Sequence, residues 1–454
     1  MRVLKFGGTS MGSAGSWRKI ISIADERRPC VLVVSATSGT TNSLIEAAEK
    51  AEAGHQEQAL EIAESIRQRH QTLLKEFIAA EKLDESRLKP AFDHIDDLIE
   101  ELNRFLNGIY TVEELTRKTL DSVSSIGERL SSKLLAECMN ATRRKACHID
   151  SGQIIKTDAE HGEATPDRNK LKSTTQILTD HCDEGAIPVM GGFYGHSPQG
   201  KITTLGRGGS DYSASLVAEA MGANALEVWT DVSGMYTCDP RGVPEAATIP
   251  KINFHEAAEL AYFGAKVLHP ASIQPAVDAD IPVWVKNTFD PAHPGTTITS
   301  EVDDNQNVKA IAFKRDITLI TITSSRMLMA YGFLARVFSV FEQLKLPVDL
   351  VTTSEVSVTM SVDRSDNLEE LCDQLSSYGE VSVDRHLALL CVVGNNFLKS
   401  RGIANRVFGA LADIPVRMIS QGSSDMNLSL VISNDKVEDG ARQLHHEFFS
   451  QNKD

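Results

Sequence analysis

Two glycine-rich segments carry the residues best suited to bind phosphate, and the first is Lys5-Phe-Gly-Gly-Thr-Ser10. An apolar, strand-like run ends there at Gly7 and Gly8, just before a helical pattern begins. Glycines in such a turn leave backbone N–H groups open to an anion at a helix N-terminus. Lys5 adds a positive charge that can follow a phosphoryl group during transfer. A glycine pair is also typical of an ordinary tight turn, so this segment alone does not define the function.

The second segment, Thr203 to Tyr212, reads TTLGRGGSDY and again leads into a helical pattern. Arg207 can bind a carboxylate through two parallel hydrogen bonds, and Ser210 can donate another. Asp211 falls at the start of the helix, where an N-cap role is an equally good interpretation. Neither glycine segment matches a Walker A loop or GxGxxG, which argues against a P-loop nucleotidase and a Rossmann dehydrogenase.

A third segment leaves an apolar strand and reads WTDVSGMYTCDPR up to Arg241. Thr230 and Asp231 stand where a parallel sheet presents side chains to a ligand. Tyr236 can cover a base, and Arg241 can reach a phosphate. As bare chemistry the segment is equally typical of an ordinary turn-rich loop.

A fourth segment, FGAKVLHP, contains Lys266 between a glycine and two apolar residues. This lysine either faces a nucleotide or is a surface lysine whose stem packs on apolar neighbours. No Ser/His/Asp arrangement or cluster of metal-ligand residues in the sequence competes with a phosphate-binding interpretation.

Short apolar runs alternate with helical patterns over the first three hundred residues. Uniformly apolar strands of this kind predict an α/β fold with a mostly parallel sheet covered on both faces. The predicted strands are Val3–Phe6, Cys30–Ser35, Ile187–Phe193, Ala225–Asp231 and Ile281–Asn287. Between about 43 and 144 the chain is instead charged, with apolar residues at helical spacing. We expect helices packed across one edge of the sheet there.

An internal repeat follows residue 308. The segment Gly332–Phe338 (GFLARVF) recurs as Gly402–Phe408 (GIANRVF), and each copy is followed by a helix and then alternating strands. Apolar β runs precede both copies, at 317–323 and 387–393. Each unit therefore reads β-α-β-β-α, and two such units predict a small α+β module.

Composition narrows the class of protein. The 454 residues suit two or three domains, and the net charge of −16 argues against a nucleic-acid partner. Seven scattered cysteines without a CxxC pair favour a reducing compartment. We expect no signal peptide, because strand-like sequence begins by Lys5, and no membrane span, because no apolar run approaches about 20 residues. These features predict a cytoplasmic protein.

Taken together and in this order, the segments resemble the amino-acid kinase family, and within it the aspartate kinases. The match also includes SATSGTTN (35–42) and SIGERLSS (125–132), and the C-terminal repeat resembles a pair of ACT domains. The resemblance implies an amino-acid-kinase-like three-layer sandwich followed by two ferredoxin-like (βαββαβ) ACT domains. It implies a kinase domain over 1–298, a linker and strand over 299–316 that contributes to the second ACT domain, and ACT domains over 317–385 and 386–454.

The resemblance also implies roles for individual residues. ATP would meet Lys5, Gly7, Gly8, Ser35, Thr230, Asp231, Tyr236, Arg241 and Lys266. L-Aspartate would be held by Thr41, Glu128, Arg207 and Ser210, while Lys5 and Asp211 would be catalytic. Mg²⁺ would arrive with the nucleotide rather than in a protein cage. The implied reaction is transfer of the ATP γ-phosphoryl group to the β-carboxylate of L-aspartate, giving 4-phospho-L-aspartate for lysine, threonine and methionine biosynthesis.

The first ACT copy would bind an end-product amino acid. Its implied contacts are Met327, Gly332, Phe333, Leu334, Val348, Asp349, Thr353, Ser354 and Glu355. An acidic pocket suits L-lysine better than threonine, although Ala330 and Tyr331 depart from the pattern expected for lysine-sensitive members. Paired ACT domains imply a homo-oligomer, a dimer or a tetramer.

Two other functions remain open at this point. A related kinase acting on another acidic amino acid would share most of these motifs. A non-catalytic amino-acid-binding regulator on a degenerate kinase scaffold is the alternative outside enzymes, and the joint presence of Lys5, Arg207, Asp211 and Asp231 argues against it. The end of the chain at Asp454, directly after the second repeat, argues against a fusion with homoserine dehydrogenase.

Overall fold

The computed structural model describes residues 1–263, 268–302, 307–327, 331–363, 367–422 and 424–450. Their chain forms two compact units. The first unit comprises Met1–Met235, Pro250–Phe254 and Val267–Val302, and the second comprises Tyr236–Ile249, His255–Lys266 and Asp303–Asp454. No helix among the described residues is long and apolar enough to cross a membrane.

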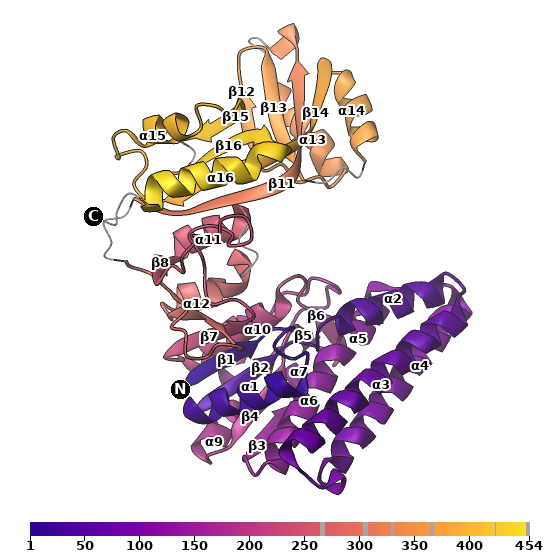
Figure 1. The fold of residues 1–454 in the computed structure, drawn as a ribbon. Coiled ribbons are helices and arrows are strands. Elements are labelled where there is room, and N and C mark those ends of the chain that lie inside the picture. The colour runs from indigo at the N-terminus through magenta and orange to yellow at the C-terminus, as the bar shows by residue number, and fades with distance from the viewer. Residues whose placement is uncertain (264–267, 303–306, 328–330, 364–366, 423, 451–454) are drawn as a thin grey trace. The chain divides into compact units, whose positions relative to one another are not determined.

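The first unit is built on an eight-stranded sheet in the order β3-β4-β2-β1-β7-β9-β10-β8 (Figure 1). All neighbouring strands run parallel except β9 and β10. Apart from the exposed Arg2 at the start of β1, the residues of the central strands are buried, as expected when helices cover both faces of the sheet. The strands are β1 (Arg2–Phe6), β2 (Cys30–Val34), β3 (Ala146–Ile149), β4 (Ile187–Gly191), β7 (Ala225–Thr230), β8 (Lys251–Asn253), β9 (Val283–Asn287) and β10 (Thr296–Thr299).

Helices pack against this sheet, and a separate two-stranded hairpin lies between β4 and α10 in the chain. Helix α10 contacts β1, β2 and β7, whereas α6 contacts β2, β3 and β4. The hairpin of β5 (Tyr194–His196) and β6 (Ile202–Thr204) precedes α10. The helices are α1 (Ala14–Glu26), α6 (Ile126–Ala141), α7 (Ser151–Ile154), α8 (Arg168–Thr174), α9 (Gln176–Asp183), α10 (Gly209–Met221) and α12 (Gln274–Asp278).

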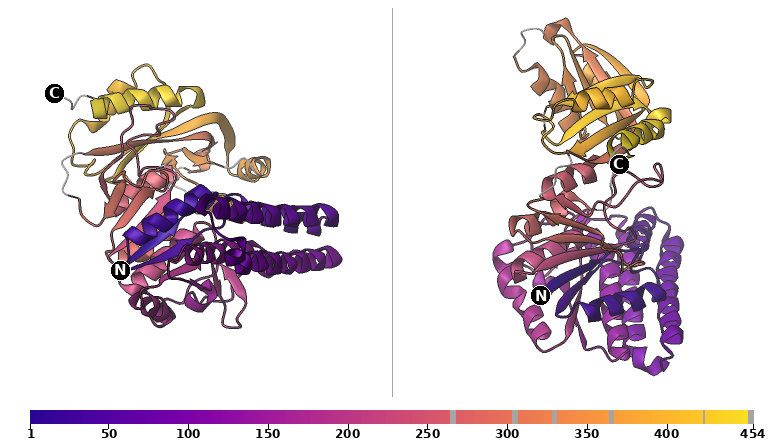
Figure 2. Two further views of the ribbon diagram at one scale, coloured as in Figure 1. Left: turned by 60° about the horizontal axis from the view of Figure 1, so that its bottom comes forward. Right: turned by 60° about the vertical axis from the view of Figure 1, so that its left-hand side comes forward.

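The charged region predicted to be helical forms α2 (Thr40–Glu52), α3 (Gln56–Glu81), α4 (Lys89–Val112) and α5 (Arg117–Ser124) before α6. Helices α3 and α4 run side by side as a long helical hairpin (Figure 2). The buried stripe of α3 has helical spacing and contains one polar residue, a histidine. Its members are Ala59, Ala63, Ile66, His70, Leu73, Leu74 and Phe77.

The second unit contains the predicted repeat. Gly332 and Gly402 adopt φ values of 73° and 83° as N-caps of α13 (Phe333–Gln343) and α15 (Ile403–Ala410). This left-handed conformation is one that glycine adopts without steric cost, which explains why both copies begin with glycine. The remaining helices are α11 (Phe254–Phe263), α14 (Leu368–Ser376) and α16 (Val437–His445).

A six-stranded antiparallel sheet joins the two copies, in the order β12-β13-β11-β14-β16-β15. Two long strands, β11 and β14, run through both halves of this sheet. The N-terminal part of β11, from Val308 to Lys314, pairs with Leu389–Gly394, whereas its C-terminal part, from Leu319 to Thr323, pairs with 380–384. The strands are β11 (Val308–Thr323), β12 (Val351–Thr353), β13 (Ser357–Val362), β14 (Glu380–Gly394), β15 (Val416–Gln421) and β16 (Asn427–Ser433).

Each half of this sheet has its own core. One core is formed with α13 and α14 around Val337 and Leu371, and the other with α15 and α16 around Val407 and Leu444. Each half thus has the ferredoxin-like arrangement of helices on an antiparallel sheet. The predicted α/β fold class, with a mostly parallel sheet followed by two such modules, is confirmed.

Candidate active site

Four parallel strands of the first unit end at the same level. Phe6 of β1 pairs with Val34 of β2 and with Trp229 of β7, and Val34 pairs with Gly191 of β4. The segments that follow these strands are therefore neighbours at the carboxyl edge of the sheet, where open α/β folds bind ligands. Two of the four predicted segments lie at this edge, the one that contains Lys5 after β1 and the one that contains Thr230 after β7, whereas the segment that contains Arg207 follows β6 of the separate hairpin.

Lys5 lies at this edge and pairs with Asp211. Its Nζ is 2.8 Å from Asp211 Oδ1, and the lysine is only 8% exposed. Asp211 is in the first turn of α10, whose N-cap is Gly208, so the alternative N-cap interpretation of Asp211 is wrong. The carboxylate instead holds the Lys5 ammonium in place, and it does so from the helix that begins directly after Arg207.

The glycine pair after β1 leaves room for an anion. A Cβ on Gly7 would lie 3.7 Å from Lys5 Nζ, and one on Gly8 would lie 3.3 Å from the Ala36 carbonyl oxygen. A side chain at Gly7 would therefore occupy the space next to the ammonium group, and one at Gly8 would crowd the backbone of residues 36–38. Bare backbone beside a lysine suits phosphate oxygens in both shape and charge.

Glu128 is a buried carboxyl group, in the first turn of α6. Its Oε1 accepts a hydrogen bond of 3.1 Å from the Ala36 N–H, while no hydrogen-bond partner of Oε2 lies among the described residues. Burial raises the pKa of Glu128 to about 8, against the opposing influence of the Ala36 hydrogen bond and the Lys5 charge. An unpartnered buried acceptor of this kind is costly and is a candidate ligand contact.

Two glycines at the end of β4, Gly191 and Gly192, lie close to Glu128 and Ser210 respectively. A Cβ on Gly191 would lie 2.9 Å from the Glu128 Cβ, and one on Gly192 would lie 2.6 Å from the Ser210 Cα. Larger residues at either position would push these neighbours away. The structure therefore brings Lys5, Asp211, Glu128 and Ser210 together around the ends of β1 and β4.

Arg207 lies in an open turn. Gly206 and Gly208 on either side have φ values of 74°, a conformation that favours glycine. The Arg207 side chain is exposed, and no ion pair of Arg207 is found among the described residues. A free guanidinium group on this turn is available to an incoming carboxylate.

Thr41 is near the N-terminus of α2, and a hydrogen-bonded chain from α3 fixes the turn just before it. Arg69 Nη2 donates to Thr40 Oγ1 (2.5 Å), Thr40 and Thr37 share a hydrogen bond of 2.5 Å, and Thr37 lies 3.1 Å from His70 Nε2. His70 Nδ1 is 2.8 Å from the Ile66 carbonyl, so Nδ1 donates and Nε2 accepts. Burial lowers the pKa of His70 to about 4, which keeps the ring neutral as this chain requires.

The other predicted nucleotide contacts are distributed over both units. Ser35 follows β2, and Thr230 ends β7 with its hydroxyl 3.0 Å from Asp231 Oδ1. Tyr236 and Arg241 belong to the second unit, where Arg241 pairs with Asp239 at 2.7 Å. Lys266 lies outside the described residues. The nucleotide role of these residues stays a prediction.

The predicted effector residues occur around α13 and the β12–β13 hairpin. Phe333 belongs to the core of the first half of the six-stranded sheet, and Met327, Leu334 and Val348 pack against that core. Gly332 caps α13, Thr353 ends β12, and the exposed Ser354 and Glu355 form the turn to β13. Ala330 lies outside the described residues, and Tyr331 is 98% exposed.

Asp349, the predicted effector carboxylate, already has partners within the second unit. The Tyr262 hydroxyl donates to its Oδ1 (2.5 Å), and Lys314 Nζ lies 3.5 Å from its Oδ2. Lys314 also pairs with Asp363. Burial and the neighbouring Asp349 carboxylate raise the pKa of Asp363, whereas the Lys314 ammonium opposes that rise. Both oxygens of Asp349 are thus occupied by groups of the chain itself.

Sequence reasoning missed Arg69, His70, Lys314 and Tyr262. One signal existed for His70, which takes an apolar position in the helical stripe of α3 where a structural polar contact is the usual reason. Lys314 and Tyr262 had no local signal, because their partners lie far away in the sequence.

No group of three or more His, Cys, Asp and Glu side chains that could hold a metal ion is found in the part of the chain that the structure describes.

Comparison of the sequence with protein families identifies the family to which the chain belongs. Residues 1–287 match the model of the amino acid kinase family, and residues 390–448 match that of an ACT domain. The chain therefore belongs to the amino acid kinase family.

Within the family, its full-length relatives are aspartokinases. It is 36% identical to lysine-sensitive aspartokinase 3 of Escherichia coli, over 98% of this chain and 99% of that one. It is 37% identical to chloroplastic aspartokinase 2 of Arabidopsis thaliana, over 98% of this chain and 84% of the relative.

Solved structures give the same result. The E. coli aspartokinase III complex with aspartate and ADP, called its R-state, superposes with a TM-score of 0.84 at 35% identity, covering 99% of this chain and 100% of that one. The T-state complex of the same enzyme with lysine and aspartate has a TM-score of 0.81 at 35% identity, with 99% of both chains covered.

Proposed function

We propose that this chain is an ATP-dependent aspartate kinase, which transfers the γ-phosphoryl group of ATP to the β-carboxylate of L-aspartate and is inhibited by L-lysine. Its full-length similarity to aspartokinases supports the reaction and the regulation. Within the site, the observation that carries the proposal is the buried Oε2 of Glu128 near Lys5, which has no hydrogen-bond partner among the described residues. Such a group suits the α-ammonium of an amino acid.

The substrate is held at its α-carbon so that its β-carboxylate is free to react. Glu128 binds the ammonium, Arg207 and Ser210 bind the α-carboxylate, and Thr41 contacts the amino acid from the turn at α2. Charge-assisted hydrogen bonds to both α-substituents fix the orientation of the side chain. The attacking β-carboxylate is anionic at neutral pH and needs no general base.

The main barrier is repulsion between this carboxylate and the triphosphate. Lys5 supplies a positive charge beside the Gly7–Gly8 backbone, and Asp211 orients it at 2.8 Å. Thr230 and Asp231 at the end of β7, together with Ser35, Tyr236, Arg241 and Lys266, bind the nucleotide in this proposal. Mg²⁺ arriving with the nucleotide would supply further positive charge to the phosphates.

In this proposal the effector binds to the first ACT domain, which contains α13 and the β12–β13 hairpin. L-Lysine binds near α13 and the β12–β13 hairpin and contacts Asp349 with one of its ammonium groups. Inhibition requires that lysine bind the less active state more tightly, and coupling of this kind is typically about 1–3 kcal/mol. We further infer a cytoplasmic homo-oligomer assembled through its ACT domains, and a product that enters lysine, threonine and methionine biosynthesis.

An ADP-release assay with ATP and Mg²⁺ tests the proposal. Aspartate should support turnover, whereas glutamate and N-acetylglutamate should not, and added lysine should lower the aspartate rate. Preference for another acidic amino acid would assign the chain to a different kinase of the family. Absence of ADP release with every acceptor would favour a binding protein without catalysis.

A further inference from the structure

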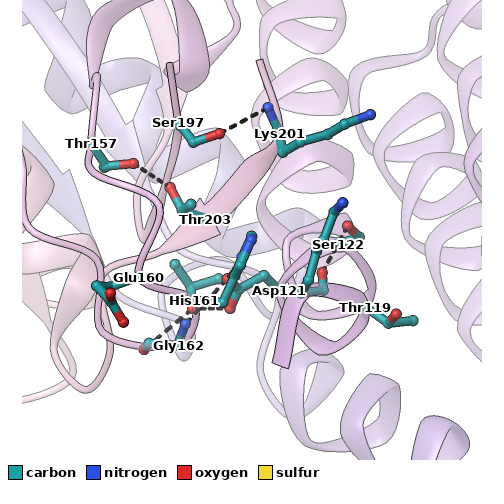
Figure 3. A network of polar contacts seen from close by, with 12 residues as sticks. Thr119, Asp121, Ser122, Thr157, Glu160, His161, Gly162, Ser197, Lys201 and Thr203 are labelled. Carbon is teal, nitrogen blue, oxygen red and sulfur yellow. Dashed lines mark hydrogen bonds and ion pairs between the residues drawn. The ribbon is translucent and has the colours of Figure 1, made fainter. Parts of the chain in front are cut away.

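A buried carboxylate outside the predicted site joins two elements of the first unit. Asp121, in α5, has a side chain that is only 3% exposed. Its Oδ1 accepts a hydrogen bond of 2.5 Å from Thr204 Oγ1, and its Oδ2 accepts 2.7 Å from His161 Nδ1 and 3.2 Å from the Gly162 N–H. Figure 3 shows the Asp121 carboxylate directed at His161 and Gly162.

Asp121 links two parts of the chain that lead directly to residues proposed to contact the amino acid. Helix α5 ends at Ser124 and leads directly into α6, whose first turn contains Glu128. On the other side, Thr204 ends β6, and Arg207 follows in the next turn. Asp121 thus connects the helix pair that holds the ammonium-binding carboxylate to the strand that leads to the carboxylate-binding guanidinium.

The turn around Arg207 needs such a connection. The flanking Gly206 and Gly208 allow many backbone conformations, so the turn does not fix itself. It is held on one side by the Lys5–Asp211 ion pair at the start of α10. On the other side, the Asp121–Thr204 hydrogen bond holds the end of β6.

The segment around His161 supports the same end of β6. The Ala164 N–H donates to the Thr204 carbonyl at 2.8 Å, and a Cβ on Gly206 would lie 3.3 Å from Glu163 Cγ. His161 and Gly162 both donate to Asp121 of α5. The segment that contains them therefore contacts α5 on one side and the turn at Gly206 on the other. Hydrogen bonds to a buried carboxylate are strong and directional, which suits a fixed spacing.

We propose that Asp121, together with Thr204 and His161, is a positioning network that sets the separation between Glu128 and Arg207 and thereby the affinity for the amino-acid substrate. This inference rests on the proposed function. None of the three residues touches the substrate in this proposal. The network therefore acts on aspartate binding and leaves the nucleotide and the phosphoryl-transfer step unaffected.

Thr204 offers the sharpest test, because one variant keeps the hydroxyl and another removes it. Thr204→Val leaves Asp121 Oδ1 without its donor, so we expect the KM for aspartate to rise about tenfold, as for loss of one charge-assisted hydrogen bond. The KM for ATP and kcat at saturating aspartate should stay within about twofold of wild type. Thr204→Ser should restore the wild-type KM for aspartate.

His161 gives an independent pair of variants. Asparagine at this position can place an N–H where Nδ1 lies, whereas phenylalanine cannot. His161→Phe should raise the KM for aspartate severalfold, and His161→Asn should raise it less. A control is Thr157→Val, which removes the 2.6 Å contact with Thr203 on the same strand without touching Asp121 (Figure 3).

The outcomes separate this inference from the proposed function. If wild type releases ADP with aspartate but Thr204→Val and His161→Phe leave the KM for aspartate unchanged, the positioning role is wrong. Equal changes in both KM values and in kcat, or the same effect in Thr157→Val, would show a merely structural role, and a thermal melt of each variant would confirm it. A wild type inactive with aspartate would overturn the proposed function itself.

Discussion

The two units each place a lysine ammonium next to carboxylates, but they differ in what is left for a ligand. In the first unit Lys5 pairs with Asp211, and the nearby Glu128 keeps one buried oxygen without a partner among the described residues. In the second unit both oxygens of Asp349 are occupied, one by Tyr262 and the other by Lys314.

This difference predicts two ways of binding an ammonium group. At Glu128 the ligand's ammonium meets an acceptor with no partner among the described residues, and binding it requires loss of a proton from a carboxyl group whose pKa is raised by burial. At Asp349 the ligand must first displace an ammonium that belongs to the chain. We therefore expect substrate binding to need little rearrangement, and lysine binding at the proposed effector site to be coupled to movement of Lys314 and Tyr262.

The largest expected effect tests the Lys5 ammonium. Lys5→Ala should lower kcat by about 10²–10³-fold, because a positioned charge that stabilises the transferring phosphoryl group is lost. The KM for aspartate should change much less. Steady-state kinetics with the exposed Lys145→Ala as a control would check this, and an unchanged kcat would remove Lys5 from the transition-state role.

Removing Arg207 tests the other charge in the first unit. Arg207→Ala should raise the KM for aspartate by about 30-fold or more, since loss of one partner of a charge-assisted pair costs roughly 2–5 kcal/mol. The KM for ATP should stay nearly constant. Arg168→Ala, which removes a surface arginine paired with Glu219 and Asp278, is the matched control. Equal losses for both substrates would contradict the assignment.

A Lys314 variant tests whether the Lys314 ammonium occupies the position at Asp349 that the effector's ammonium is proposed to take. Lys314→Met removes the internal ammonium and leaves Asp349 and Asp363 to attract an external one, so half-inhibition should need about tenfold less lysine, a change of about 1.4 kcal/mol. Lys436→Met, on an exposed lysine of the same unit, should leave inhibition unchanged. Weaker inhibition in Lys314→Met would show that Lys314 helps to form the site instead of competing for it.

The smallest expected effect is the pH dependence of the KM for aspartate, which Glu128 should cause. Below its pKa of about 8 this carboxyl group is protonated in the free protein and must lose its proton to bind an ammonium group. The KM for aspartate should therefore fall roughly fivefold from pH 7 to pH 8 and level off above that range. Glu128→Gln should bind aspartate weakly and without this pH dependence. A wild-type KM that rises between pH 7 and pH 8 would contradict the prediction.

The same shift has a consequence for stability, with a definite sign. The folded protein keeps the Glu128 proton up to about pH 8, whereas the unfolded chain releases it near pH 4.5, the ordinary pKa of a glutamic acid side chain. The contribution of Glu128 to stability is therefore fully present below about pH 4.5 and is lost as pH rises through 8. Chemical denaturation should show less loss of stability across this range in Glu128→Gln than in wild type.

Much of the fold could be predicted from the sequence because its signals are local. The apolar runs that became β1, β2, β4, β7 and β9 are buried on both faces, and the repeated glycine marks the start of α13 and α15. The short strands β3, β8 and β10 were not predicted. Their pairing depends on neighbours in the sheet more than on their own residues.

The candidate site was predicted less completely, because its contacts join distant parts of the chain. The glycine segments indicated an anion site, and the family resemblance implied that Asp211 orients Lys5, but the residues alone left a helix N-cap as an equally good interpretation of Asp211. His70, Asp121 and Lys314 act through partners supplied by other elements. Their roles follow from side-chain geometry, which residue spacing does not encode.

The two long strands β11 and β14 have a consequence for how the second unit assembles. Val308–Lys314 can complete its hydrogen bonds only with Leu389–Gly394, and the whole first half of the sheet lies between them in the chain. Folding of that inserted half brings Ile317 next to Leu387 and so shortens the loop that the outer half must close. We therefore expect the outer half to fold last, so that a substitution that slows folding of the inner half delays both.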